Sequence, residues 1–177
     1  MTLESSVTEV TQWIEAQGIP RNELTPPITT DQLAALRASV PLPFPQDFLA
    51  LYSRHNGFPH WLILEDTWHL LDSEMILEIY RENQDVFDDI IATEPWRAEW
   101  LPLLSNGAGD YLLLDLKTSE VGIYFHEGGE YEFAYPDLTA YFNHVAEGFR
   151  AGCYQYSEDD GMTFVQTSRM DSYTDSD

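Results

Sequence analysis

The chain has 177 residues, which is enough for one ordinary domain with a hydrophobic core. Its 31 acidic and 8 basic side chains give a net charge of −23, and a field of that sign repels nucleic acid and anionic membranes while it attracts basic proteins or cations. Because there is one cysteine (Cys153), no signal-peptide pattern and no stretch near the roughly 20 apolar residues that span a bilayer, we expect a cytoplasmic protein without an intramolecular disulfide.

The first predicted helix covers residues 7–17, where apolar residues recur on one helical face. Its start matches a capping box, in which Ser6 is followed three residues later by Glu9. Gly18 and a nearby proline end the helix. We expect residues 1–28, which are this helix and a proline-containing connector, to form part of the domain.

Two further helices are predicted before the centre of the chain. One begins at Thr29 or Thr30 and stops before Pro41. The other begins at Pro45, which a first helical turn tolerates because its missing N–H would have no partner there. Gly57 stands where a left-handed C-cap residue belongs, so the sequence places the end of this helix near it.

Residues 61–71 contain two short apolar runs around a polar turn, which predicts a hairpin at the edge of a sheet. Asp72 or Ser73 then caps a helix that continues through Tyr80. Residues 82–99 are acidic and irregular, and we interpret them as a loop or frayed helix that lies over the sheet.

Four short apolar runs, separated by turn-forming residues, predict four consecutive strands in the centre of the chain. They cover residues 100–104, 111–114, 121–126 and 130–134. The clearest amphipathic helix follows over residues 138–149. A hairpin within residues 153–167 and an acidic mobile tail at 168–177 complete the chain. Helices first, strands in the middle and a helix afterwards indicate a single α+β domain.

No motif predicts a catalytic, cofactor-binding or metal-binding residue. The glycines at 107–109 lack the third glycine of a dinucleotide loop, and they precede a strand instead of a helix. His55 and His60 could approach each other as metal ligands, but surface or capping histidines are commoner. Asp110 and Asp115 bracket a strand and could act as ligands or acids, although we favour them as turn acceptors.

Three segments together resemble the SMI1/KNR4 family, whose members are also called SUKH domains. They are Leu42-Pro43 with Asp47-Phe48-Leu49 and Asn56-Gly57; Trp100-Leu-Pro-Leu through Gly109-Asp110 to Leu114-Asp115-Leu116; and Gly122-Ile123 with the helix Leu138 to Val145. The resemblance covers about residues 29–149, and we place the family-like domain at 29–152. The acidic insertion at 82–99 and the residues after Gly152 depart from the family pattern.

The resemblance implies a mostly antiparallel sheet of about five or six strands flanked by helices, with no catalytic residues. Many bacterial relatives look like immunity proteins that bind toxin domains, often nucleases, whereas fungal relatives are linked to cell-wall regulation. An acidic binder would steer association with a basic nuclease, although the charge of −23 would also serve solubility alone. The first hypothesis is therefore a non-enzymatic immunity protein.

Two alternatives stay open at this point. One is an intracellular regulatory or scaffold domain, and the other is a carboxylate-dependent enzyme with a cleft beside residues 107–110. For the binding hypothesis, we expect carboxylates in the predicted turns and in the acidic insertion to contact the partner. These residues are Glu65, Asp66, Asp88, Asp89, Glu127 and Glu130.

Overall fold

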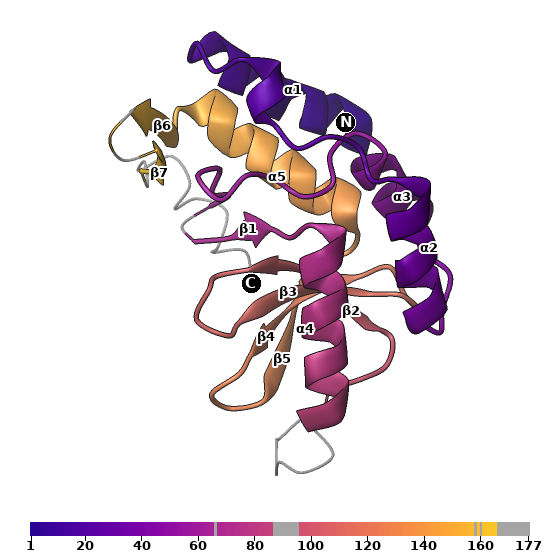
Figure 1. Ribbon diagram of the computed structural model, residues 1–177. Coiled ribbons are helices and arrows are strands. Elements are labelled where there is room, and N and C mark those ends of the chain that lie inside the picture. Colours follow the sequence, from indigo (N-terminus) through magenta and orange to yellow (C-terminus); the bar gives the residue numbers. More distant parts are fainter. Residues whose placement is uncertain (66, 87–95, 158, 160, 166–177) are drawn as a thin grey trace.

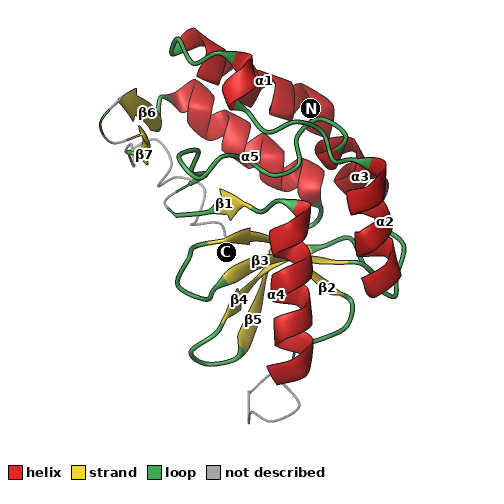
Figure 2. Cartoon of the chain, in the orientation of Figure 1, coloured by secondary structure: helices red, strands yellow, loops and turns green. Residues whose placement is uncertain are grey.

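The computed structural model describes residues 1–177 with the exception of 66, 87–95, 158, 160 and 166–177 (Figure 1). Figure 2 shows the helices in red and the strands in yellow; most strands lie in the second half of the chain, and helices both precede and follow the central strands. The described elements are α1 (Leu3–Ala16), η1 (Arg21–Glu23), α2 (Thr30–Ser39), α3 (Gln46–Tyr52), β1 (His69–Leu70), α4 (Ser73–Val86), β2 (Trp100–Ser105), β3 (Tyr111–Asp115), β4 (Val121–Phe125), β5 (Glu130–Tyr135), α5 (Leu138–Ala151), β6 (Tyr154–Ser157) and β7 (Gly161–Phe164). This arrangement confirms the α+β fold class.

The main sheet has the order β1-β2-β3-β4-β5, and every neighbouring pair of strands is antiparallel. Strands β2 to β5 form the predicted meander, so each strand pairs with the next one in the sequence. The short strand β1 forms one edge, and β5 forms the other. A separate two-stranded sheet, β6 with β7, follows α5.

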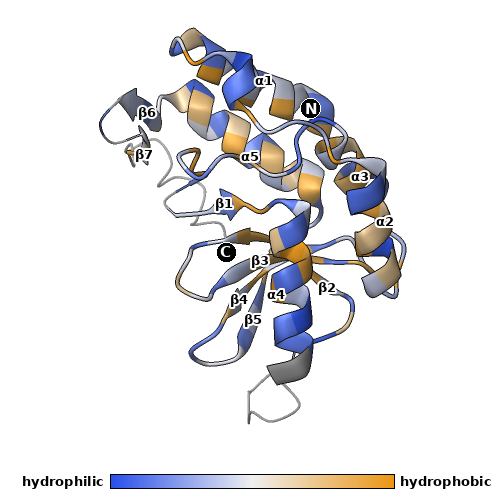
Figure 3. Ribbon diagram, in the orientation of Figure 1, coloured by the Kyte–Doolittle hydropathy of each residue, from blue (hydrophilic) through white to orange (hydrophobic). Residues whose placement is uncertain are grey.

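The helices α1 and α5 pack against each other beside the sheet (Figure 1). Trp13 and Phe149 bring their ring centroids to 4.9 Å, and the Arg150 Nε lies 2.7 Å from a carboxylate oxygen of Glu9. Along both helices, apolar segments alternate with polar ones (Figure 3), as expected for helices with one buried face. Asp137 and Gly152 cap α5, with Gly152 in the left-handed region.

The two faces of the sheet bury different kinds of side chain. One face contributes aliphatic side chains such as Leu101, Leu112 and Leu114 to the large core that the sheet shares with the helices. The other face carries a smaller aromatic cluster, in which the buried residues are Trp96, Trp100, Leu113 and Tyr124 and the partly buried ones are Tyr111 and Tyr131. Both sides of the central strands are therefore covered, which explains their nearly continuous apolar sequence.

The first helix begins earlier in the chain than the sequence predicted. It begins at Leu3, and Thr2 is its N-cap, because the Thr2 side chain accepts a hydrogen bond from the Ser5 N–H. Ser6 is buried, and its hydroxyl donates to the Asn143 side chain on α5 at 2.6 Å. The predicted capping box at Ser6 is wrong because this serine serves the α1–α5 interface.

Two other boundaries also differ from the prediction. Helix α3 ends at Tyr52, well before Gly57, whose φ of 77° occurs where the chain passes the backbone of Asp72. The hairpin expected at 61–71 is reduced to one bridge between Leu64 and Trp68, and only β1 joins the sheet. In the acidic insertion, the first residues continue α4 to Val86.

Candidate functional site

The β2–β3 and β4–β5 turns are tied together at one end of the sheet. One carboxylate oxygen of Asp110 accepts hydrogen bonds from the His126 backbone N–H at 3.0 Å and from His126 Nδ1 at 2.9 Å. The other oxygen accepts a hydrogen bond from the Asn106 amide at 2.8 Å. Burial acts to raise the pKa of Asp110, but these hydrogen bonds outweigh it, and the pKa is lowered. Asp110 therefore fixes the position of both turns.

This fixed end of the sheet presents two of the predicted contact residues. Glu127 and Glu130 lie in and just after the β4–β5 turn, and both are exposed. Neither carboxylate forms a salt bridge with a residue that the structure describes. Glu132 is also exposed and follows Glu130 by two residues on β5, so we call the surface formed by Glu127, Glu130 and Glu132 the acidic hairpin.

Asp115, at the opposite end of β3, has the structural role that the sequence favoured. One of its oxygens accepts hydrogen bonds from the backbone N–H groups of Lys117 and Thr118, at 2.8 and 3.1 Å. These bonds close the β3–β4 turn. Asp110 and Asp115 thus lie at opposite ends of one strand, and each carboxylate is already used by a turn.

Glu65 lies elsewhere, in a hydrogen-bonded cluster. Its carboxylate accepts from His144 Nε2 at 3.1 Å and from the Tyr135 hydroxyl at 3.2 Å, and its side chain is 20% exposed. Its backbone N–H donates to the Tyr154 hydroxyl at 2.8 Å. The hydrogen bond to Glu65 is the main reason that the pKa of His144 is raised. Glu65 therefore joins its loop to β5, α5 and β6, and a role in partner binding stays a prediction.

The remaining predicted contact residues, Asp66, Asp88 and Asp89, lie outside the described residues. Two exposed residues of β5, Glu132 and Phe133, were not among the predicted contact residues. The signal was present in the alternation of residues 130–133, which places Glu130 and Glu132 on one face of the strand. Glu132 extends the acidic surface of the turn along the edge of the sheet.

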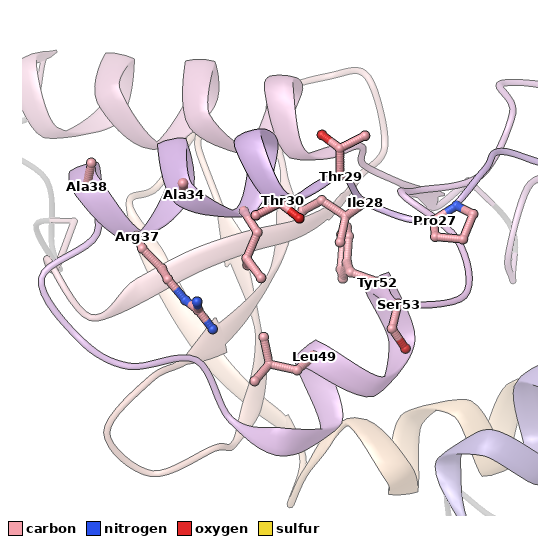
Figure 4. Close-up of a pocket in the computed structure, with 11 residues that line it drawn as sticks. Pro27, Ile28, Thr29, Thr30, Ala34, Arg37, Ala38, Leu49, Tyr52 and Ser53 are labelled. Atoms are coloured by element: carbon pink, nitrogen blue, oxygen red, sulfur yellow. The ribbon is translucent and has the colours of Figure 1, made fainter.

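Two cavities bear on the hypothesis of a carboxylate-dependent enzyme. The larger, of about 660 Å³, lies between α2 and α3 (Figure 4) and is lined by apolar side chains such as Leu33 and Leu49. Arg37 is the charged residue among its described lining residues, and its guanidinium extends from α2 toward Leu49. This cavity contains no pair of carboxylates in its described lining.

The second cavity, of about 420 Å³, reaches the β2–β3 turn at Gly107. Its polar lining includes His60, His69 and Asp72. Burial lowers the pKa of His69, and the nearby His60 adds to this effect. Asp72 is the single carboxylate among the lining residues described, and one of its oxygens already accepts from the N–H groups of Glu74 and Met75 at the start of α4. The geometry gives the two-carboxylate hypothesis no support.

The histidines also do not gather as metal ligands. His55 Nδ1 lies 3.0 Å from the backbone oxygen of Thr25, and its pKa is lowered chiefly by burial. Within the described ranges, no three His, Cys, Asp or Glu side chains are grouped as they would be around a metal ion. Among those same residues, no helix has the length and apolar character to cross a bilayer.

The model of the SMI1 / KNR4 family (SUKH-1) matches residues 27–144, which include both tied turns and β5. A search of curated proteins finds no match.

Proposed function

The chain belongs to the SMI1/KNR4 (SUKH-1) family, and from this premise we propose that it is a non-enzymatic binding domain, an immunity protein that neutralises a basic toxin domain by direct contact. The observation that carries the proposal is the acidic hairpin. Its carboxylates are exposed, and the Asp110–His126 hydrogen bonds hold the turn that presents them. The protein acts in the cytoplasm, where such a toxin would reach its target.

The mechanism follows from charge. A net charge of −23 attracts a cationic partner over a distance of about 10 Å at moderate salt, which accelerates encounter. A nuclease domain holds phosphates with lysine and arginine, so carboxylates placed on that surface compete with its nucleic acid. At least four of the basic residues that the structure describes pair with acidic side chains of the same chain: Arg21, Arg54, Lys117 and Arg150. Little positive charge is thus left to oppose a basic partner.

Co-expression with the toxin domains encoded by neighbouring genes tests the proposal. We expect one of them to be neutralised, with cell survival restored, and we expect the purified pair to associate more slowly as salt is raised. If the protein rescues cells from none of these domains and binds none at low salt, the immunity role is wrong. Capture of a non-toxin protein encoded beside it would instead favour the regulatory alternative.

A further inference from the structure

The outer edge of β5 has no partner strand among the described residues. β5 pairs with β4 from Phe125↔Glu130 to Val121↔Tyr135, and no backbone hydrogen bond joins it to another described segment. Within the described ranges, the side of this six-residue strand that faces away from β4 has no paired strand to accept its backbone N–H and C=O groups. Such an edge is able to accept a further strand.

The side chains of this edge divide into a charged face and an aromatic face. Glu130 and Glu132 point to one side of the sheet and are exposed. Tyr131 and Phe133 point to the other side, where Phe133 is 58% exposed. Tyr131 stacks on Trp100 with ring centroids 4.8 Å apart, which holds the strand against the sheet. Phe133 is left as an apolar contact at the rim.

This pattern disfavours a second copy of the chain as the occupant. Pairing two β5 strands would bring the Glu130 and Glu132 side chains of both copies together, and each copy carries a net charge of −23. Like charges on neighbouring strands are destabilising. A strand that carries cations on one face and apolar side chains on the other has the complementary pattern.

We propose that the outer edge of β5, the edge opposite β4, accepts an extended basic segment of the partner as a sixth strand of the sheet. Lysine or arginine side chains of that segment face Glu130 and Glu132, and an alternate apolar side chain packs beside Phe133. Main-chain hydrogen bonds supply affinity, and the alternation supplies specificity. This inference rests on the proposed function, because it assigns the basic partner to one edge of the acidic hairpin.

A labelled peptide that alternates lysine and valine tests the edge directly, by fluorescence anisotropy with the full chain. We expect binding to wild type and a loss of about tenfold or more in affinity for Glu130→Lys with Glu132→Lys. Glu23→Lys with Glu78→Lys makes the same change in net charge at exposed positions on η1 and α4, and should cost much less. A smaller loss is expected for Phe133→Ser, with Met75→Ser as the control at another exposed apolar residue.

Two peptide controls separate strand addition from charge attraction. A peptide with N-methyl groups on one edge keeps every charge but cannot donate those backbone hydrogen bonds, so its binding should be lost. A scrambled peptide of the same composition should bind weakly. If either peptide binds as well as the original, the sixth-strand proposal is wrong.

The same variants separate this inference from the proposed function. If a toxin domain is bound by wild type and equally well by Glu130→Lys with Glu132→Lys, the immunity role stands and the edge assignment fails. If the alternating peptide binds at β5 but no toxin domain is bound, the edge assignment stands and the immunity role fails.

Discussion

The ring of Tyr131 on β5 lies directly over Gly122 on β4. A Cβ atom added to Gly122 would be 2.3 Å from two ring carbons of Tyr131 and 2.4 Å from its hydroxyl oxygen. The ring continues over the sheet to stack on Trp100, with an interplanar angle of 14°. Glycine at position 122 thus provides the space in which the edge strand is fixed to the centre of the sheet.

This contact predicts that Gly122→Ala destabilises the fold by about 1–3 kcal/mol, because the new methyl group forces the tyrosine ring to move. Denaturant unfolding measures the cost. In a Tyr131→Ala background, the same alanine should cost far less, since the space is then empty and alanine suits a strand better than glycine. Equal costs in the two backgrounds would show that the ring is not the obstacle.

The Asp110 hydrogen bonds predict a dependence of stability on acid. Because folding lowers the pKa of Asp110, its carboxylate stabilises the fold above the unfolded pKa of about 3.9, and this contribution is lost as pH falls through the folded pKa. Asp110→Asn should lower the free energy of unfolding at neutral pH by about 1–2 kcal/mol and reduce the loss on acidification. Glu127→Gln removes an exposed carboxylate from the adjoining turn and is the matched control; the interpretation fails if both variants behave alike.

The Glu65–His144 pair predicts a dependence of opposite sign. Because folding raises the pKa of His144, the pair stabilises the fold below the unfolded histidine pKa of about 6.5, and the contribution is lost as pH rises through the folded pKa. The groups that act on His144 are Glu65 and Glu147, and the Tyr135 ring packs beside it.

His144→Gln should therefore cost about 1–2 kcal/mol at pH 6 and less at pH 9. The informative quantity is the difference between wild type and variant, because burial lowers the pKa of His55 and His69 and gives those residues the reverse dependence. Denaturant unfolding of both proteins at several pH values measures this difference in the free energy of unfolding. A cost that is constant from pH 6 to pH 9 would contradict the assignment.

Long-range electrostatic attraction and direct contact should affect different rate constants of toxin binding. Glu127 lies in the turn, outside β5, so Glu127→Lys should lower the association rate constant, by about threefold at low salt, and leave the dissociation rate nearly unchanged. Glu132→Lys should raise the dissociation rate as well, because Glu132 lies on the strand that pairs with the partner. Stopped-flow measurements over a range of salt separate the two effects; a dissociation rate unaffected by both substitutions would exclude β5 as the contact.

Much of the fold could be predicted because its signals are local. Thr29 and Gln32 form a reciprocal capping box at the start of α2, and the turn residues of the central meander occur where the hairpins turn. Helix α5 follows its amphipathic pattern to the left-handed Gly152. The family resemblance, which the family model confirms, also depends on short segments in a fixed order.

The sequence by itself determined the α+β class, the order of the strands from 100 to 134, the family and the charge, since periodicity, turn residues and composition act over a few neighbouring positions. Only the tertiary structure decided which polar residues face solvent. Ser6 was predicted to cap the first helix, but its hydroxyl donates a hydrogen bond to Asn143. Glu65 was predicted to present a solvated carboxylate in a turn, and that carboxylate accepts hydrogen bonds from His144 and Tyr135. Side chains distant in sequence compete for the same hydrogen bonds, and their proximity exists only after the sheet and helices have packed.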